Sequence, residues 1–224
     1  MARRAAPPVL SDTQMRALLD KYHCPVPFHV VRARILGHIA SPVLGGSPTK
    51  VVEALWGGEL PVFDSIDAAN ELFGALMMGL WNRLARHQEP SAPFRLTRID
   101  LPATREGLTR LAVMRQEELQ GFQEGLFGAN ESLQEGLFGA NESLDLPEQA
   151  HKAIGILSEI RAMLEGTAAV ATNPDKPGTD AEAASLIRTL HELTRVAEGE
   201  IHRAVLSCAR ARRQMTPAPR PVRH

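Results

Sequence analysis

The sequence predicts an all-α protein: a compact helical domain of six to seven helices with a long C-terminal helix and a disordered basic tail. Two observations favour this fold class. Apolar residues recur at spacings of three and four along most of the 224 residues, which is the period of a helix that buries one face. No stretch alternates apolar and polar residues with β-branched enrichment, so the pattern of a strand is missing.

The first two predicted helices are separated by prolines. The sequence Ser11-Asp12-Thr13-Gln14 matches a capping box and opens a helix that ends near Tyr22. Pro25 and Pro27 then interrupt the helical pattern. A second helix is expected over residues 28–40.

The third and fourth predicted helices both begin at a serine. Ser47 caps the third, Pro48 occupies its first position, and Gly57-Gly58 end it at Trp56 with left-handed residues. Ser65 caps the fourth, whose apolar stripe must face a core. The stripe consists of Ile66, Ala69, Leu72, Phe73, Leu76, Met77, Leu80 and Leu84.

Two further helices occupy the middle of the chain. Thr104 can cap one that carries apolar residues as far as Phe122, and Pro147 begins the next. Gly166 is expected to end that helix. The proline- and glycine-rich residues 166–178 are interpreted as a linker.

The C-terminal helix is predicted over residues 179–214, opened by a capping box at residues 179–182. Its seam contains small and polar residues as often as large ones, which favours packing on the body of the protein over an autonomous coiled coil. Residues 215–224 are rich in proline and are expected to be disordered. The seam residues are Ile187, Leu190, Thr194, Ala197, Ile201, Ala204 and Cys208.

An exact tandem duplication lies inside the predicted domain, because residues 123–133 recur unchanged as residues 134–144. Eleven residues make about three helical turns, so a continuous helix would absorb the extra copy with a shift of only about 20°. Gly128 and a capping box at residues 132–135 favour the alternative, a break followed by a short helix over 133–138. A natural and an engineered origin both fit the sequence.

Four short motifs follow one another along the chain: Gly37-His38, Leu55-Trp56-Gly57, Pro61-Val62-Phe63 and Trp81-Asn82. In these motifs and their order, the chain resembles the YecA/YgfB-like family of bacterial proteins. The segment Glu118-Leu119-Gln120-Gly121-Phe122 is similar to a later helix of that family. The resemblance covers residues 10–165 and implies a compact all-α domain.

The same resemblance limits what can be carried over to this chain. The family has no established catalytic residues. Many members carry a C-terminal cysteine-rich segment that binds zinc, but Cys208 is the one cysteine in that region here. Zinc binding is therefore not implied, and no cofactor is expected.

Composition restricts the class of protein. The chain is 44% hydrophobic and 23% charged with a formal net charge of −1, as expected for a globular protein. Cys24 and Cys208 are too few for a disulfide framework. The longest uncharged stretch is broken by glycines and prolines, so no membrane span is expected. The start lacks an apolar signal segment, which favours a cytoplasmic protein.

A metal site is considered at His191, Glu198 and His202, which share one face of the last predicted helix. Arg195 lies beside them and would repel a cation, and the second histidine of the zinc-protease motif is missing. A solvated polar face is the preferred interpretation. No metal ligand is therefore predicted.

Two other candidate sites also have simpler explanations. Cys24 lies near His23 and His29, which suggests a nucleophile and its base, but no orienting acid is close in sequence. A small buried thiol is the preferred interpretation. The loop 45–48 before Lys50 could hold an anion, but it lacks the ending of a P-loop, and helix capping explains it. No catalytic residue is predicted.

The two tryptophans are interpreted as core residues. Trp56 and Trp81 could instead anchor a partner, since aromatic residues concentrate in binding hot spots. With only 4% aromatic residues, the chain needs them for its own core. Asn82 lies beside an apolar stripe and is expected to hold a neighbouring loop through its amide.

The arginines at the C-terminal end are the residues most expected to contact a partner. Residues 201–224 hold six arginines and no acid, whereas residues 105–165 hold eleven acids and five bases. The contact could be an acidic protein surface, the chain's own acidic middle or the phosphates of a nucleic acid, although no aromatic residue interleaves for base stacking. A solvated tail that aids solubility explains the arginines equally well. The arginines are Arg203, Arg210, Arg212, Arg213, Arg220 and Arg223.

The sequence thus favours a non-enzymatic bacterial protein that acts by macromolecular interaction in a regulatory or accessory role, with a protein as its partner. The alternative is a nucleic-acid-associated module that uses the arginine-rich end. A metal-dependent enzyme using His191 and His202 is the third hypothesis. A homodimer is left open.

Overall fold

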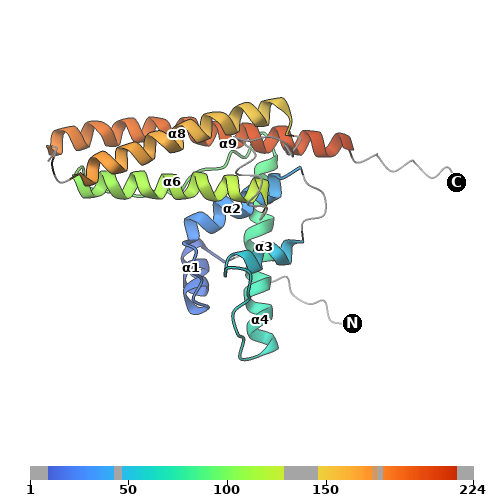
Figure 1. The fold of residues 1–224 in the computed structure, drawn as a ribbon. Coiled ribbons are helices and arrows are strands. Elements are labelled where there is room, and N and C mark those ends of the chain that lie inside the picture. Colours follow the sequence, from blue (N-terminus) through green and yellow to red (C-terminus); the bar gives the residue numbers. More distant parts are fainter. Residues whose placement is uncertain (1–9, 43–46, 129–145, 174, 176–178, 216–224) are drawn as a thin grey trace.

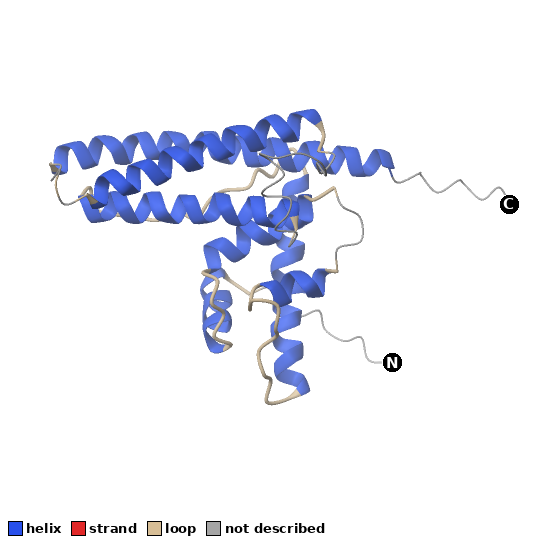
Figure 2. Cartoon of the chain, viewed as in Figure 1, coloured by secondary structure: helices blue, strands red, loops and turns tan. Residues whose placement is uncertain are grey.

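The computed structural model describes residues 10–42, 47–128, 146–173, 175 and 179–215. Over these residues it contains helices and no strand, which confirms the all-α prediction (Figure 2). Because α4, η1, α5 and η2 follow one another without a break, the described part holds seven helices. The elements are α1 (Asp12–Lys21), α2 (Phe28–Ala40), α3 (Pro48–Ala54), α4 (Ile66–Phe73), η1 (Gly74–Trp81), α5 (Asn82–Ala85), η2 (Arg86–Gln88), α6 (Arg105–Phe127), α8 (Glu148–Thr172) and α9 (Asp180–Met215).

The three longest helices, α6, α8 and α9, lie side by side as an elongated bundle (Figure 1). Helix α2 packs against α6, and α1, α3 and the continuous helix from α4 to η2 project away from one side of the bundle. The lower end of α4 is remote from the bundle in this view. The molecule therefore has a bundle and a smaller projecting part joined through α2.

The junction of α2 and α6 depends on glycine at the crossing. A Cβ atom added at Gly37 would overlap the backbone oxygen of Phe122, and one added at Gly125 would overlap the backbone oxygen of Arg34. The two backbones thus approach more closely than any side chain permits. On the outer side of this crossing, the guanidinium of Arg34 pairs with the carboxylate of Glu124.

Most predicted helix starts are confirmed by their hydrogen bonds. Ser11 and Gln14 form the complete capping box of α1, and the Ser65 and Thr104 hydroxyls accept from backbone N–H groups at the starts of α4 and α6. The capping box at Thr179 opens α9, whose predicted span and buried seam are also confirmed. These bonds satisfy N–H groups that have no partner within their own helix.

Helix α3 differs from its prediction at both ends. The side chain of Ser47 makes no capping hydrogen bond, and the helix ends at Ala54, two residues before Trp56. Gly57 and Gly58 do adopt positive φ angles of 76° and 101°, as expected for the residues that turn the chain after a helix. The prediction of left-handed glycines is confirmed, and that of the side-chain cap is wrong.

The fourth helix contains a π-helical segment, η1, that the apolar spacing did not predict. Leu72, Leu76, Leu80 and Leu84 are all buried. In a regular α-helix, residues spaced four apart move gradually around the helix axis. The π segment has more residues per turn, and this keeps the four leucines on one face. Ile66 is 82% exposed. Its assignment to the buried stripe is wrong, because the first turn of α4 extends beyond the helices that cover the rest.

Helix α8 continues through Gly166 to Thr172, so the predicted end at Gly166 and the linker starting there are wrong. A glycine inside a helix costs only about 1 kcal/mol, and the alanines that follow favour helix. The added length is held in place by the bundle, since Arg105 of α6 donates to the backbone oxygens of Ala171 and Asn173.

Some predictions fall outside the described residues. The second copy of the duplication, 134–144, and the short helix proposed over 133–138 are among them, as are residues 216–224 of the tail. The first copy is described as far as Gly128. Helix α6 ends there, and Gly128 has a φ of 80°.

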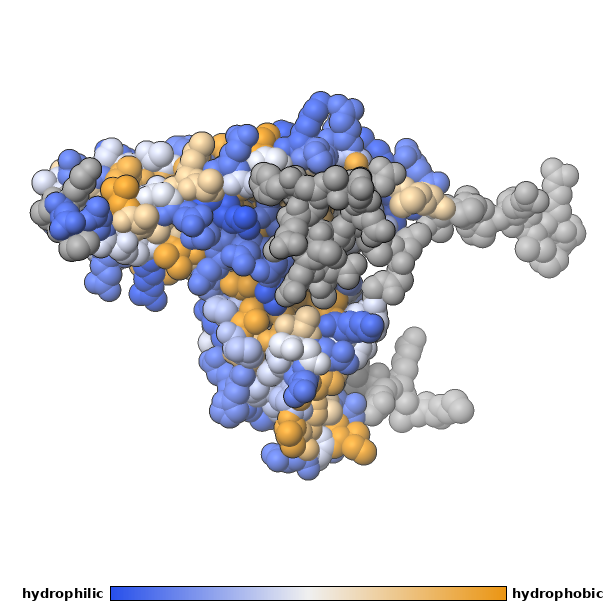
Figure 3. All heavy atoms as spheres, in the orientation of Figure 1, coloured by the Kyte–Doolittle hydropathy of each residue, from blue (hydrophilic) through white to orange (hydrophobic). Residues whose placement is uncertain are grey.

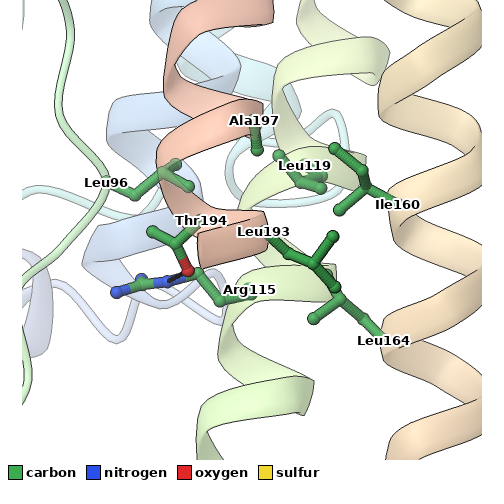
Figure 4. Close-up of a pocket in the computed structure, with 8 residues that line it drawn as sticks. All are labelled: Leu96, Arg115, Leu119, Ile160, Leu164, Leu193, Thr194 and Ala197. Carbon is green, nitrogen blue, oxygen red and sulfur yellow. Dashed lines mark hydrogen bonds between the residues drawn. The ribbon is translucent and has the colours of Figure 1, made fainter. Parts of the chain in front are cut away.

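The interior of the bundle is closely packed. Side chains of α6, α8 and α9 meet beside Leu96, and the space between them is too small for a water molecule (Figure 4). The residues drawn in Figure 4 are Leu96, Arg115, Leu119, Ile160, Leu164, Leu193, Thr194 and Ala197.

Across the described helices, none combines the length and the apolar composition that crossing a membrane requires.

Candidate functional site

An open groove of about 660 Å³ lies between the α1–α2 turn, the first half of α6 and the extended segment 97–99. Its apolar walls include Leu19 of α1, Pro25 to Phe28 of the turn, Ile99, and Val113 with Met114 of α6. A cavity of this volume can hold several side chains of a ligand. The groove is therefore a candidate binding site.

The wall formed by the α1–α2 turn is fixed by hydrogen bonds to its backbone. The N–H of Cys24 donates to the Leu19 oxygen at 2.9 Å. The indole N–H of Trp56 donates to the Tyr22 oxygen at 2.8 Å. His23, between these two, has a φ of 50°, a left-handed conformation that the surrounding bonds hold. This wall is therefore preformed.

The opposite wall is held by a buried ion pair. The side chains of Arg115 and Glu118 are 5% and 1% exposed, and their closest N–O distance is 2.5 Å. Glu118 accepts from the N–H of Thr97 at 2.7 Å, and Arg115 donates to the Thr97 oxygen at 2.7 Å. The two charges compensate each other within α6, and both side chains also bind the backbone of Thr97 in the extended segment. We call this arrangement the Thr97 clamp.

The clamp is completed by the last helix. The Nε of Arg115 donates to the hydroxyl of Thr194 on α9, and Figure 4 shows this bond. Glu198 of α9 accepts from the N–H of Leu96 at 3.0 Å and from Arg95 at 2.6 Å. Segment 95–99 is thereby attached to both α6 and α9, which places Arg98 and Ile99 at the groove.

Three arginines give the groove a cationic rim. Arg16, Arg98 and Arg110 are exposed, and none lies within ion-pair distance of a carboxylate of the described residues. The Arg16 guanidinium lies 5.3 Å from the centre of the Phe28 ring, over its face. Two acids also line the groove: Glu117 is paired with His29 at 2.8 Å, and Asp20 is exposed without an ion pair to the described residues.

Cys24 lines the groove but does not have the surroundings of a nucleophile. Its sulfur approaches the backbone oxygens of Val26 and Leu55, and His29 is bonded to Glu117. Burial raises the pKa of the Cys24 thiol above its ordinary value, which lowers the thiolate fraction at neutral pH. The geometry supports the interpretation of Cys24 as a half-buried structural thiol.

The structure does not bring the candidate metal ligands together with further donors. Glu198 is engaged by Arg95 and the Leu96 backbone, and His191 is exposed. His202 is half-buried on the same helix. Within residues 10–42, 47–128, 146–173, 175 and 179–215, no three His, Cys, Asp or Glu side chains are grouped as a metal site would require.

The structure provides no support for the anion site proposed at loop 45–48. Residues 43–46 lie outside the described part of the chain. Helix α3, which follows them, has seven residues. The hypothesis of an anion at this helix start therefore gains no support.

The aromatic, proline and glycine residues of motifs 55–57, 61–63 and 81–82 serve mainly to pack the projecting part. Trp56 and Trp81 are both packed against the core, as predicted. The Phe63 ring contacts Tyr22 edge-on with centroids 5.5 Å apart, and Trp81 contacts His38 in the same way at 5.6 Å. Pro61 is half-buried beside them, and Gly57 forms the turn after α3.

Asn82 differs from its prediction. It is exposed, and its amide donates to the Met78 oxygen of its own helix at 3.1 Å. The expectation that it holds a neighbouring loop is wrong, because an exposed amide needs no tertiary partner.

Two of the four arginines assigned to partner binding on α9 are used within the chain. Arg203 pairs with Glu200 at 2.7 Å. Arg212 donates to the Ile39 oxygen of α2 at 2.5 Å, and burial lowers the pKa of its guanidinium. Arg210 and Arg213 are exposed and have no carboxylate within 4 Å among the described residues. Arg220 and Arg223 lie outside those residues.

Like the groove, the surface of segment Glu59–Asp67, which includes the first residues of α4, is not among the sites predicted from the sequence. Val62 and Ile66 are 95% and 82% exposed. Figure 3 shows hydrophobic surface at the lowest tip of the molecule, where this segment lies. Carboxylates flank it at Glu59, Asp64 and Asp67. The signal in the sequence is the run Glu-Leu-Pro-Val-Phe-Asp-Ser-Ile-Asp, in which apolar residues around a proline stand between acids.

The groove and this segment are two surfaces whose apolar and charged side chains the described part of the chain leaves unpaired. Both are built from ordered, packed elements. Comparisons with protein-family models, with curated proteins and with solved structures give no match for this chain.

Proposed function

We propose that this protein is a non-enzymatic binding protein that holds a segment of another polypeptide in the groove beside α1, α2 and α6. One observation carries the proposal: apolar walls and three arginines that pair with no carboxylate of the described residues occur together in one open cavity of about 660 Å³. Apolar walls supply affinity when they are covered, and the arginines orient an acidic or carbonyl-rich chain.

The nature of the walls favours a polypeptide over a nucleic acid. Single-stranded nucleic acids are held by exposed aromatic faces on which bases stack. The aromatic ring of the groove, Phe28, is only 6% exposed and is covered by Arg16. Aliphatic walls formed by Ile99, Val113 and Met114 instead suit the side chains of a peptide.

The cellular role that fits this activity is regulatory or accessory, in the cytoplasm of a bacterium. The resemblance of residues 10–165 to the YecA/YgfB-like family is part of the same proposal. Gly37 and Gly121, which belong to the motifs of that resemblance, both lie at the α2–α6 crossing. The motifs therefore maintain the scaffold that presents the groove.

The test uses the full chain as bait in a nuclease-treated lysate of its host, followed by purification and identification of the bound protein. The purified partner is then titrated against wild type, Val113→Glu and the matched control Val196→Glu. Val113 lines the groove, and Val196 is exposed on α9. We expect at least tenfold weaker binding for Val113→Glu, since a charge is placed in an apolar wall. Equal affinities for the three proteins would refute the proposal.

A second candidate function is nucleic-acid binding through the end of α9. Arg210 and Arg213 favour it, because they are exposed there without acidic neighbours among the described residues. Labelled RNA and DNA would be titrated at two salt concentrations with wild type and with Arg210→Gln/Arg213→Gln. If the arginines contact phosphates, the double variant lowers the slope of log affinity against log salt by about two. An unchanged slope removes this candidate.

A further inference from the structure

We propose that the groove also binds a second copy of this chain, through the acidic apolar segment Glu59–Asp67 of the neighbouring molecule. The inference rests on the proposed function, because it assigns an occupant to the same groove. It predicts head-to-tail self-association, in which one molecule contributes its groove and the next contributes its segment.

The segment has the features of a preformed ligand. Val62 and Ile66 are the two most exposed large hydrophobic residues of the described chain. Phe63, between them, packs inward against Tyr22 and Phe73, with ring centroids 5.5 and 6.4 Å apart. The outward side chains are therefore held by a fixed backbone. A rigid segment loses little conformational entropy when it binds.

The charges of the segment complement those of the groove. Glu59, Asp64 and Asp67 are exposed, and no cationic side chain of the described residues lies within ion-pair distance. The nearby base Lys21 is already paired with Glu71 at 2.6 Å. The segment thus presents three acids beside two apolar side chains, whereas the groove presents three arginines against one unpaired acid, Asp20, beside aliphatic walls. Such complementarity speeds encounter and fixes orientation.

A single molecule cannot place its own segment in its own groove. The segment lies at the end of α4 remote from α6 (Figure 1), whereas the groove is lined by α1, the α1–α2 turn, segment 97–99 and α6. Moving it would separate Phe63 from Tyr22 and Phe73, which belong to the packed core of the projecting part. The contact must therefore form between molecules. Because groove and segment are different surfaces, the contact is heterologous, and it leads to a ring or an open chain.

Sedimentation velocity on two complementary variants tests this geometry. Arg98→Glu/Arg110→Glu reverses the groove and keeps the segment, while Asp64→Lys/Asp67→Lys reverses the segment and keeps the groove. Each variant alone is expected to remain monomeric up to about 100 μM, and wild type to grow in mass with concentration. An equimolar mixture of the two variants is expected to grow in mass again, because the acidic segment of one variant meets the intact groove of the other, and the lysine-bearing segment meets the glutamate-bearing groove.

Two controls match the charge changes on surfaces outside the proposed contact. Arg86→Glu/Arg188→Glu carries the charge change of the groove variant, and Glu159→Lys/Glu165→Lys carries that of the segment variant. These residues are exposed and make no ion pair with the described residues. Both controls should associate as wild type does. Circular dichroism melting curves of all variants establish that each is folded.

Three outcomes overturn the inference: a monomeric wild type at all concentrations, variants that associate as wild type does, or oligomers that disappear on nuclease treatment. The proposed function is tested separately by the partner titration with Val113→Glu. A monomeric wild type with a groove-dependent partner would refute self-association and leave the proposed function standing. A groove variant that loses neither self-association nor its partner would refute both.

Discussion

The Thr97 clamp makes a quantitative prediction about Glu118. Glu118→Gln preserves the size of the side chain and removes its charge. The Arg115 guanidinium, 5% exposed, would then keep only the Thr97 oxygen at 2.7 Å and the Thr194 hydroxyl at 3.2 Å as partners. Removing one member of a buried ion pair costs about 3–5 kcal/mol, because the remaining charge is uncompensated. We therefore expect the free energy of unfolding to fall by about 4 kcal/mol.

The chain contains a matched control for this substitution. Arg195 and Glu192 form an ion pair with the same three-residue spacing, but on the exposed surface of α9. Glu192→Gln should cost less than about 0.5 kcal/mol, since exposed pairs are screened by water. Urea denaturation at pH 7, followed by circular dichroism, measures both values. A loss below about 1 kcal/mol for Glu118→Gln, or equal losses for the two variants, would refute the reasoning.

Four further predictions concern glycine and cysteine. Gly125→Ala should destabilise the protein by about 3 kcal/mol or more in urea titrations, because its Cβ overlaps the Arg34 backbone. Gly166→Ala, whose Cβ meets nothing within 4 Å, should raise stability by about 0.5–1 kcal/mol. Burial raises the pKa of Cys208 from 9.0 to about 11. The unfolded chain therefore loses this proton first, and the unfolding free energy should fall as pH rises from about 9 to 11. Cys208→Ala should reduce that decline. At pH 8, an exposed-thiol reagent should modify half-buried Cys24 before fully buried Cys208, and the reverse order would contradict the structure.

The sequence was most informative where neighbouring residues decide the structure. Ser11, Ser65 and Thr104 were predicted as helix caps because a hydroxyl and the N–H groups it binds lie within one turn. The prediction that Gly166 ends α8 is wrong for the opposite reason. Gly166 is weakly unfavourable locally, and contacts made by distant Arg105 extend the helix beyond it.

The candidate site was beyond the sequence because its parts come from distant stretches. Nothing in the chain order relates residues 97–99 to the α1–α2 turn, which lies about seventy residues earlier. The spacing of Arg115 and Glu118 is the same as that of Glu192 and Arg195. Only the packing of α6 beneath α9 makes the first pair a buried clamp and leaves the second on the surface.

The composite origin of the groove links its occupancy to the stability of the whole chain. Its walls exist together only while α1, α2, α6 and segment 97–99 are all in place. A bound segment therefore adds to the free energy of global unfolding, by about 2.7 kcal/mol when its free concentration is one hundred times the dissociation constant. Unfolding and proteolysis from the unfolded state then become less frequent by about a hundredfold. Through this linkage, the supply of the bound segment would set how long the protein persists in the cell.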